Sequence, residues 1–386
     1  MRILHFVTGG FSGATQVAVD LSLAALRTPG HEVLLVLRRK PSTDERKIEA
    51  LRQQGLQVIV VSNWLHALTV WELRKIIRDF RPDAVFAHGF SDQIWGRRAA
   101  VAEGVPRIFH VEHNTRERYT RRRLAQAQAL MPYTEACIGV SEGVRISLIE
   151  RGFDPAKCIA IPNGIDLERF PESILMPWHE REPAIIMASR FARQKDHATL
   201  IQALALLKEQ GITPKLYLAG GGKQRLQHKA RLLVDRLRLQ EQVQFLGNVG
   251  DLPQRLGSVQ IFVLSTHWEG QGLATVEAMA AGCACIATDV PGAREVIEPN
   301  ITGFRVPESD AGALAARLRQ LLESPQQAYQ VGLAARKHAL KYYGRERMWQ
   351  QYQELLRSQC WKNGFHKTIE KAKNKINMRA TSKDLS

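Results

Sequence analysis

The stretch that decides the fold is residues 261–290, IFVLSTHWEGQGLATVEAMAAGCACIATDV. It begins with an apolar, β-branched run from Ile261 to Leu264 and then passes through a glycine-rich loop. A segment of helical period starts near Gly272, and a second apolar run begins at Cys283. The order of strand, loop, helix and strand predicts one unit of a parallel sheet, with the loop at the carboxyl edge where ligands bind.

The loop and the start of the helix are suited to binding an anion. The first backbone N–H groups of a helix have no partner inside the helix, and the helix dipole adds a partial positive charge there. Gly270 and Gly272 carry no Cβ, so a phosphate can approach the N–H groups of the residues that follow. These residues are Leu273, Ala274 and Thr275. The pattern therefore predicts a phosphate site at this helix N-terminus.

Two carboxylates flank the predicted phosphate site, Glu269 in the loop and Glu277 in the first turns of the helix. A carboxylate beside a phosphate costs free energy unless a donor compensates it, and sugar or ribose hydroxyls are such donors. We therefore predict a nucleotide-sugar as the ligand. The alternative is that Glu269 is a solvated loop residue and that Glu277 only interacts with the helix dipole.

These residues also carry a resemblance. Glu269-Gly-Gln-Gly-Leu followed by Glu277-Ala-Met-Ala-Ala-Gly is similar to the EGFGL…EAMA.G signature of family 4 glycosyltransferases. The similarity extends to Val243-Gln-Phe-Leu-Gly and to Gly303-Phe-Arg-Val. It implies a retaining enzyme of the GT-B fold that binds its donor here. Gln271 is a departure, because the family usually has an aromatic residue at this position of the donor loop.

The rest of the chain alternates short β-branched runs with amphipathic stretches, which is typical of a doubly wound α/β fold. In the first half the predicted strands are 3–8, 33–37, 58–61, 84–88, 107–111, 136–140 and 158–161. In the second half they are 184–188, 215–219, 243–246, 261–264, 285–287 and 304–306. With the resemblance, this predicts two Rossmann-like parallel-sheet domains that face a central cleft.

The domain boundary is expected in the proline-rich stretch from Pro171 to Pro183. We expect an acceptor-binding domain at 1–172 and a nucleotide-sugar-binding domain at 173–344. A helix at 345–360 has the period to pack back on the first domain, as is common in GT-B proteins, and residues 361–386 form a basic tail.

A second glycine-rich turn follows the first strand, in TGGFSGATQ from Thr8 to Gln16. Such a turn is often no more than a tight bend. In the resembled family a Gly-Gly loop here faces the donor phosphates and the acceptor, which assigns Gly13 to donor binding. Ala14 replaces the second glycine of that pair.

Histidines follow two neighbouring strands of the predicted first domain. His88 ends the fourth strand and His113 lies just beyond the fifth, at the edge where ligands bind in open sheets. By itself a lone histidine is usually a structural residue. The family places a histidine at the end of this strand against the transferred sugar, which the resemblance carries over to His113. His110 is the competing candidate, and His88 is expected to line the cleft.

Cations follow the first strand of the second half, in SRFARQKDH from Ser189 to His197. Arg190 and Lys195 are expected to neutralise the donor diphosphate without a metal, as the family's Arg and Lys do after this strand. Arg193 lies between them and can share that role. A glycine turn at Gly220 is expected to form the floor of the nucleotide pocket, with a simple turn as the alternative. In the resembled family the segment that corresponds to Leu246–Val249 lines the base through its backbone, which the resemblance carries over to Val249.

Length and composition bound the class of protein. At 386 residues with 45% hydrophobic content, the chain is long enough for two domains that each bury a core. No run approaches the roughly 18–20 uncharged apolar residues that span a bilayer, and we expect no signal peptide. The five cysteines are odd in number and show no C-x-x-C pairing, which predicts buried thiols in a reducing cytosol.

The formal net charge of +16 indicates that the protein attracts anionic partners. Two basic clusters stand out, one from Arg116 to Arg123 and one in the tail after Cys360. Each cluster by itself could be a merely solvated face. Together they favour an anionic membrane surface, and hence a cytoplasmic protein on the inner face of the membrane. Nucleic acid is not expected as the partner, because only Tyr119 and Phe365 are available for base stacking.

The sequence therefore predicts a retaining glycosyltransferase that uses a nucleoside-diphosphate-sugar, with UDP favoured, and a saccharide or glycolipid acceptor. No metal or other cofactor is expected to be required. A GT-B nucleotide-sugar 2-epimerase is the alternative enzyme, and a protein that only binds nucleic acid or an anionic surface is the alternative outside enzymes.

Overall fold

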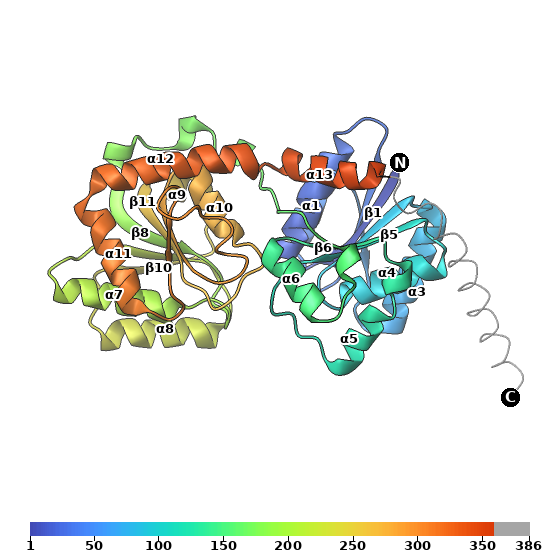
Figure 1. Cartoon of the computed structure of the whole chain (residues 1–386), viewed down its shortest axis with the longest axis horizontal. Helices are drawn as coiled ribbons and strands as arrows, with labels where there is room; N and C mark the ends of the chain where they lie inside the picture. The colour runs from blue at the N-terminus through green and yellow to red at the C-terminus, as the bar shows by residue number, and fades with distance from the viewer. Residues whose placement is uncertain (359–386) are drawn as a thin grey trace, which may run out of the picture. The chain divides into compact units, whose positions relative to one another are not determined.

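The computed structural model describes residues 1–358, and the chain divides into two compact units. Unit 1 contains Met1–Gly164 and the segment that starts at Arg345, and unit 2 contains Ile165–Gly344 (Figure 1). The division falls before the residue 172 expected from the prolines, because the backbone N–H of Ile165 already bonds to the carbonyl of Tyr343 at 2.8 Å. The predicted basic tail at 361–386 lies outside the described residues.

Unit 1 is built on a sheet of seven parallel strands in the order β3-β2-β1-β4-β5-β6-β7. Its strands are β1 (Arg2–Thr8), β2 (Glu32–Arg38), β3 (Gln57–Val61), β4 (Ala84–His88), β5 (Arg107–Glu112), β6 (Ala136–Gly139) and β7 (Cys158–Ala160). Its helices are α1 (Gly13–Leu26), α2 (Glu45–Gln53), α3 (His66–Phe80), α4 (Asp92–Ala102), α5 (Arg121–Gln128), α6 (Glu142–Glu150) and α13 (Arg345–Arg357). The strand order reverses between β1 and β4, which places the ligand-binding edge of the sheet there.

Unit 2 repeats this design with six parallel strands in the order β10-β9-β8-β11-β12-β13. Its strands are β8 (Glu182–Ala188), β9 (Leu216–Ala219), β10 (Val243–Gly247), β11 (Val259–Leu264), β12 (Ala284–Thr288) and β13 (Phe304–Val306). Its helices are α7 (His197–Glu209), α8 (Gln224–Arg236), α9 (Leu252–Gly257), α10 (Leu273–Ala280), α11 (Ala311–Glu323) and α12 (Pro325–Tyr342). Here the reversal falls between β8 and β11.

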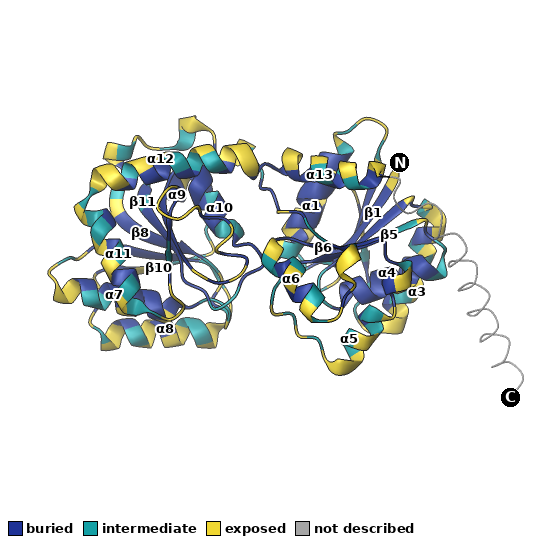
Figure 2. Ribbon diagram, viewed as in Figure 1, coloured by how far each residue is buried: buried dark blue, intermediate teal, exposed yellow. Residues whose placement is uncertain are grey.

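Helices cover both faces of each sheet, so most strands are buried on both sides (Figure 2). In β8, Ile185 and Met187 belong to one hydrophobic cluster, while Ala184, Ile186 and Ala188 belong to the cluster on the opposite face. Successive strand residues point to opposite faces, and continuous apolar runs such as this one are therefore what a two-sided parallel sheet requires.

The last described helix, α13, packs against α1 of unit 1. Trp349 fixes the contact, because its indole Nε1–H donates to Thr28 Oγ1 at 2.9 Å. Met348 and Trp349 are both buried. The apolar residues that gave residues 345–357 their helical period therefore face unit 1, to which the helix belongs.

The predicted doubly wound α/β fold with two parallel sheets is confirmed, and every predicted strand is present within about two residues of its expected ends. The predicted buried thiols are confirmed for Cys137, Cys158, Cys283 and Cys285, which are all buried and unpaired. Cys360 lies outside the described residues. Within residues 1–358, no helix combines the length and the apolar character needed to cross a membrane.

Candidate functional site

The predicted donor residues of unit 2 meet where the strand order reverses. The loop after β8 and the loop after β11 lie side by side at the carboxyl edge of the sheet and are joined by backbone hydrogen bonds. The N–H of Asp196 donates to Ser265 O at 3.0 Å, and the N–H of His267 donates to Gln194 O at 2.8 Å. The two loops therefore form one rigid rim at the position where open α/β sheets bind ligands.

Lys195 and Glu269 form an ion pair across this rim. Both side chains are largely buried, with 13% of Lys195 and 8% of Glu269 exposed. Gln194 Nε2 donates to Glu269 Oε2 at 3.1 Å, and Thr266 Oγ1 lies 3.2 Å from Glu269 Oε1. The carboxylate is thus held by three neighbours, which compensates its desolvation and fixes its direction.

Arg190 and Arg193 lie in the same loop with a different environment. Both are exposed, and neither forms an ion pair with any other residue of the described chain, 1–358. Between them, Phe191 is buried and stacks on His197 with ring centroids 4.1 Å apart. The loop is therefore anchored by an aromatic residue and presents two unpaired guanidinium groups, which is the arrangement needed to meet a polyanion.

The glycines of the 220–222 turn pack against the backbone of this loop. A Cβ on Gly220, whose φ is +138°, would lie 2.1 Å from the carbonyl oxygen of Ser189. The N–H of Phe191 donates to Gly221 O at 2.7 Å. The structure therefore gives these glycines a packing reason, the close approach of two backbones. The predicted role of Gly220 in donor binding stays a prediction.

The N-terminus of α10 has the geometry predicted for an anion site. Gly272 precedes the helix in the left-handed conformation, with φ +77° and ψ +50°, and no side chain caps the helix. The N–H groups of Leu273 and Ala274 make no hydrogen bond within residues 1–358, whereas that of Thr275 bonds to Gly272 O at 2.8 Å. The buried hydroxyl of Thr275 has no partner in that range either. Unsatisfied donors at a helix start are what an anion binds.

The glycine-rich loop before α10 is held from one side by Gly292. A Cβ on this residue, whose φ is +83°, would lie 2.4 Å from the carbonyl oxygen of Gly270. Gln271 is buried within the same loop, at 3% exposed. The loop between Glu269 and Gly272 therefore has a defined path.

Glu277 is paired with a residue that the sequence analysis missed. Arg169 Nη1 lies 3.2 Å from Glu277 Oε1, and the Glu277 side chain is 19% exposed. Burial raises the pKa of Glu277, and the charge and hydrogen bond of Arg169 oppose that shift. Arg169 precedes Glu277 by 108 residues, so their spacing in the sequence gave no sign of the contact. The ion pair with Arg169 fixes the orientation of the Glu277 carboxylate, which helps it to accept hydrogen bonds from hydroxyl groups.

In unit 1, the structure brings His88 and His113 together and adds His5 to them. His88 Nδ1 lies 3.1 Å from His113 Nε2, and His88 Nε2 lies 3.0 Å from His5 Nδ1. Desolvation lowers the pKa of His5 and of His113 to about 3, and it lowers that of His88 well below 6.5. The row therefore consists of neutral imidazoles at ordinary pH.

His110 does not join this row. It is fully buried beside Phe153, and its Nε2 lies 3.5 Å from Glu112 Oε2. Tyr119 also donates to that carboxyl oxygen, at 2.9 Å. Burial raises the pKa of Glu112 to about 7. Of the two histidines that the sequence offered, His113 is the one that contacts His88 at the sheet edge.

Gly13 starts α1 directly after the N-cap residue Ser12. A Cβ on Gly13 would meet no atom within 4 Å, whereas one on Gly9 would lie 2.9 Å from Arg38 O. The tight turn therefore needs Gly9, and the space beside Gly13 is open on the described chain. The predicted donor contact of Gly13 stays a prediction.

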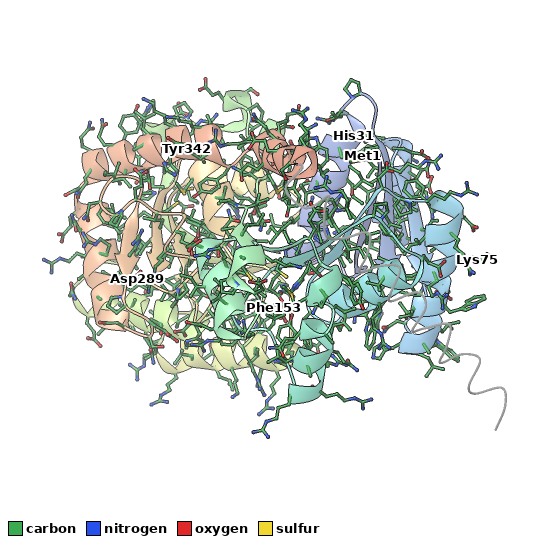
Figure 3. All side chains as sticks on the ribbon, turned by 45° about the vertical axis from the view of Figure 1, so that its right-hand side comes forward. Met1, His31, Lys75, Phe153, Asp289 and Tyr342 are labelled. Carbon is green, nitrogen blue, oxygen red and sulfur yellow. The ribbon has the colours of Figure 1, made fainter. Side chains whose placement is uncertain are left out.

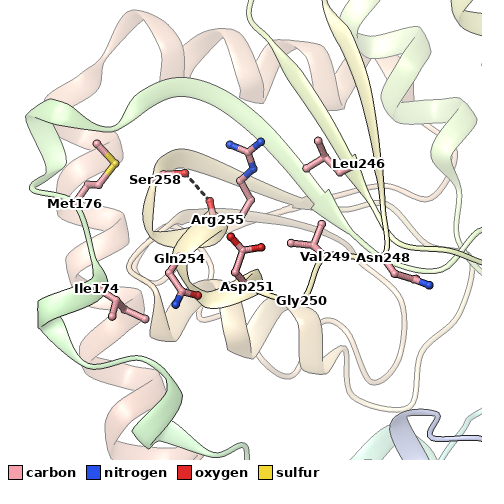
Figure 4. A pocket seen from close by; sticks show the side chains of 10 residues that line it. All are labelled: Ile174, Met176, Leu246, Asn248, Val249, Gly250, Asp251, Gln254, Arg255 and Ser258. Carbon is pink, nitrogen blue, oxygen red and sulfur yellow. Dashed lines mark hydrogen bonds between the residues drawn. The ribbon is translucent and has the colours of Figure 1, made fainter. Parts of the chain in front are cut away.

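A cavity of about 650 Å³ lies along α9 in unit 2 (Figure 4). It is lined by Ile174, Met176, Leu246, Asn248, Val249, Gly250, Asp251, Gln254, Arg255 and Ser258. Val249 is the one predicted donor residue in this set, and no residue from the start of α10 lines the cavity. Its relation to a nucleotide base therefore rests on Val249 alone.

Sequence reasoning missed Gln194, Thr266, Arg169 and His5. A signal existed for His5, because it is a polar residue in the otherwise apolar strand Ile3 to Val7. Gln194 directly precedes Lys195, and Thr266 precedes Glu269 by three residues, but their contacts depend on how the two loops pair. Taken together, unit 2 offers cations, two directed carboxylates and open helix N–H groups, which can hold a diphosphate that carries hydroxyl-rich groups.

Two family models match the chain over most of its length. Residues 11–169 match the model described as Glycosyltransferase Family 4, and residues 176–344 match the model described as Glycosyl transferases group 1. The predicted family is therefore confirmed.

Curated relatives include two bacterial enzymes. The UDP-Gal:alpha-D-GlcNAc-diphosphoundecaprenol alpha-1,3-galactosyltransferase of Escherichia coli is 27% identical over 255 residues, 62% of this chain and 66% of that enzyme. The N-acetylgalactosamine-N,N'-diacetylbacillosaminyl-diphospho-undecaprenol 4-alpha-N-acetylgalactosaminyltransferase of Campylobacter jejuni is 28% identical over 196 residues, 50% of this chain and 52% of that enzyme. The chain thus spans between half and two thirds of these relatives.

A solved structure extends the likeness across the whole fold. Alr3699/HepE of Anabaena, in complex with UDP and glucose, superposes with a TM-score of 0.81 over 93% of this chain and 100% of its own. The two sequences are 22% identical. At this identity the likeness shows the fold alone, which is the two-domain GT-B fold.

Proposed function

The chain belongs to glycosyltransferase family 4, and on this premise we propose that it transfers a hexose-like sugar from a nucleoside-diphosphate-sugar to a saccharide acceptor. The donor is a UDP-sugar, and the anomeric configuration is retained. The observation that carries the proposal is the meeting of the Lys195–Glu269 pair with the glycine-rich loop that leads into α10.

The choice of UDP rests on named relatives. The Escherichia coli relative uses UDP-Gal by its name, and the Anabaena structure contains UDP and glucose. A nucleoside diphosphate also matches the chemistry of unit 2, where Arg190 and Arg193 are unpaired with described residues and the first N–H groups of α10 are open. These groups suit two phosphates in a row better than a single carboxylate.

Departure of UDP develops negative charge on its β-phosphate as the bond to the sugar breaks. In the proposed mechanism Arg190, Lys195 and the N-terminus of α10 stabilise that charge. They are in place before the reaction, because the loops that carry them are tied to each other by backbone hydrogen bonds. No metal is required in this scheme, because the cations and the helix N–H groups neutralise the diphosphate.

Glu269 and Glu277 orient the two hydroxyl-rich parts of the donor. Glu277 accepts from the ribose hydroxyls and Glu269 from hydroxyls of the sugar, which fixes the anomeric carbon for attack. His113 contacts the transferred sugar, the role that family resemblance assigns to it. No enzyme nucleophile is proposed; the leaving phosphate removes the proton from the acceptor hydroxyl on the same face of the sugar.

The acceptor we propose is a lipid-linked saccharide or a growing cell-surface polysaccharide or lipopolysaccharide. The names of the two bacterial relatives both include a diphosphoundecaprenol carrier. The excess of positive charge supports a protein that works at an anionic membrane surface. Within unit 1, the basic run from Arg121 to Arg123 forms the start of α5.

The test is a transfer assay with a panel of UDP-sugars and an undecaprenyl-diphosphate-linked saccharide, in which released UDP is measured. NMR of the product gives the anomeric configuration, which we expect to equal that of the donor. Arg190→Ala should lower kcat by about a hundredfold or more, since it removes charge stabilisation. EDTA should leave the rate unchanged.

Two controls distinguish sugar transfer from the alternative activity and a site effect from a general effect of charge. The donor incubated without an acceptor tests the 2-epimerase alternative, which predicts a changed sugar and no need for an acceptor. Arg319→Ala, which alters an exposed cation on α11, should leave the rate unaffected. Absence of UDP release with every donor and acceptor, in a folded protein, would refute the proposed activity.

A further inference from the structure

Unit 1 exposes a group of large apolar side chains that its own fold does not use. Within residues 1–358, 13 large hydrophobic side chains are exposed, and four of them fall within residues 64–71. These are Trp64 (92% exposed), Leu65 (67%), Leu68 (37%) and Trp71 (58%), which we call the α3 surface. Apolar residues scattered singly on a surface are normal, whereas a contiguous group that includes two tryptophans marks an interaction site.

The spacing places this surface on one side of α3. Leu68, Trp71, Lys75 and Arg78 follow one another at intervals of three or four residues, and Trp64 directly precedes the N-cap residue Leu65. The stripe therefore runs from apolar residues to two cations, of which Arg78 is paired with Glu103 at 3.7 Å. Lys75 lies on the outer face of the helix (Figure 3) and forms no ion pair with a described residue.

The opposite face of α3 packs into unit 1. Thr69, Leu73 and Ile77 are buried there. The helix therefore packs one face into the fold and exposes both apolar and cationic residues on the other. Acidic residues on the helix are not part of the stripe's apolar end. Glu72, for example, is turned inward and accepts from the backbone N–H of Ser62 at 2.6 Å.

The α3 surface is held in place and is not a loose loop. The guanidinium of Arg38 contacts both Asn63, one residue before Trp64, and Asp92 at the start of α4. His66 stacks on the buried Trp95 with ring centroids 4.6 Å apart. Thr69 Oγ1 donates to Ser62 O at 2.8 Å. These contacts fix the backbone and leave the two tryptophans pointing away from the fold.

Cations surround the start of α3. Burial lowers the pKa of His66, and the charges of Arg38, Arg123 and Lys40 lower it further. Arg123 belongs to the basic run that starts α5, and α5 reaches α3 through α4, which contacts both helices. Arg38 is buried and paired with Asp92, which leaves Lys40 and Arg123 as the cations of this group that can meet an anionic partner. An apolar, tryptophan-rich surface with cations beside it is complementary to a bilayer with anionic head groups.

The position of the surface links it to the predicted acceptor residues. All strands of the unit 1 sheet run parallel, so their carboxyl ends share one edge. Trp64 follows the carboxyl end of β3 by three residues, and His88 and His113 lie at the carboxyl ends of β4 and β5. The α3 surface therefore begins at the same sheet edge as the histidine row and continues from there along α3.

We propose that the α3 surface inserts into the head-group region of an anionic bilayer and so brings the carboxyl edge of unit 1 to the membrane. Trp64 and Trp71 lie at the level of the head groups, where an indole buries its ring and keeps its N–H wet. Lys75 and the basic run of α5 contact lipid phosphates. The inference rests on the proposed function in one respect, which is that the acceptor is carried by a membrane lipid.

Vesicle binding tests this proposal directly. The full chain is mixed with phosphatidylcholine vesicles that contain or lack phosphatidylglycerol, and the bound fraction is measured by sedimentation at low salt. The variant Trp64→Ser/Leu68→Ser/Trp71→Ser should lose about tenfold or more of the partition coefficient, because each exposed side chain contributes its apolar transfer free energy. The matched control is Leu232→Ser/Ile301→Ser/Leu333→Ser, which removes three exposed apolar residues of unit 2 and should bind as the native chain does.

Several outcomes would overturn the proposal. These are native protein that binds neither vesicle, equal binding by the α3 variant and the control, and a native dimer that the α3 variant makes monomeric without loss of vesicle binding. If the triple variant does not fold, Trp64→Ser alone carries the test, since a side chain that is 92% exposed contributes little to folding.

Failure of this proposal is distinguishable from failure of the proposed function. Both variants should keep the native stabilisation by UDP, because none of the six changed residues belongs to the candidate donor site. The α3 variant should also keep its rate with a water-soluble acceptor analogue and lose rate only with the acceptor in vesicles. An equal loss with both acceptors would contradict a membrane role.

Discussion

Three neutral imidazoles in a row can carry their protons in only two ways. If His5 Nδ1 donates to His88, then His88 Nδ1 donates to His113 Nε2, and His113 keeps its own proton on Nδ1. The reverse arrangement would leave an N–H on His5 Nε2, which is buried without a hydrogen-bond partner in the described chain. A buried unpaired N–H is the costlier defect, so the first arrangement is favoured.

We therefore predict that His113 presents an N–H donor at Nδ1 and does not act as a base. Long-range ¹H–¹⁵N NMR of the histidine side chains should show the Nδ1–H form for His113. His5→Phe keeps a ring against Phe86 but removes the donor that sets the row, so the spectrum of His113 should change to a mixture or to the Nε2–H form. His179→Phe, at a side chain that is 82% exposed, is the control. An Nε2–H form of His113 in the native protein would contradict this argument.

The Lys195–Glu269 pair should matter for stability as well as for donor binding. Lys195→Met leaves a largely buried carboxylate without its cation and should lower the free energy of unfolding by about 3 kcal/mol. Adding Glu269→Gln should restore much of that loss, because the uncompensated charge is gone, while transfer activity stays absent. Arg319→Met breaks an exposed pair on α11 and should change stability by less than about 0.5 kcal/mol. Urea unfolding of the set measures this, and equal effects of the two cation changes would refute it.

At the scale of elements, local pattern was sufficient for the strands. Most strands of these parallel sheets are buried on both faces, so they appear in the sequence as short continuous apolar runs bounded by polar or glycine residues. The start of α1 was less apparent. Its apolar period begins at Val17, whereas the helix begins at Gly13. The earlier start is fixed by a hydrogen bond from the backbone N–H of Ser12 to Thr15 Oγ1 at 3.3 Å.

Contacts between loops could not be read from the sequence. The predicted residues Glu269 and Glu277 each have a basic partner, but Lys195 precedes Glu269 by 74 residues and Arg169 precedes Glu277 by 108. Which loop lies against which depends on the strand order, and the strand order is a property of the assembled sheet. The sequence therefore predicted which residues form the candidate site and left open how they pair.

The path of the donor loop should depend on Gly292. Alanine at this position would place a Cβ 2.4 Å from Gly270 O and would require a φ of +83°. We expect Gly292→Ala to cost about 2 kcal/mol or more of stability, seen as a lower Tm, and to weaken UDP binding. Gly312→Ala on α11 is the control, because a Cβ there comes no closer than 3.4 Å to any atom and the residue lies outside the candidate donor site. Equal Tm values for the two variants would show that the loop adapts easily.

At the scale of the whole molecule, the two units repeat one plan. Each has its ligand edge where the strand order reverses, between β1 and β4 in unit 1 and between β8 and β11 in unit 2. The sequence predicted both sheets, because each half repeats the alternation of strand and helix. It placed the boundary at the prolines, whereas the chain joins unit 2 at Ile165 through a hydrogen bond to Tyr343, a contact that no local pattern signals.

The basic residues of the molecule fall into two groups, one in each unit. The cations of the donor loop are Arg190, Arg193 and Lys195, and those beside the α3 surface include Lys40, Lys75 and Arg123. The first set lies in unit 2 and the second in unit 1, so the strong positive charge of the sequence serves two anionic partners in the account given above. The sequence predicted both partners but assigned the membrane to the basic clusters alone, because the exposure of Trp64 and Trp71 becomes visible only in the fold.

The central claim is that unit 2 binds a nucleoside diphosphate, and a thermal-shift measurement with UDP, GDP, ADP and CMP tests it most directly. Binding to the folded state at 100 to 1,000 times Kd should add about 3–4 kcal/mol of stability. We predict that UDP raises the Tm of the native protein, that Arg190→Ala and Glu277→Ala abolish most of this response, and that Glu323→Ala on α11 keeps it. If none of the four nucleotides stabilises the native protein, or if both site variants respond as the native protein does, the proposed donor site is wrong.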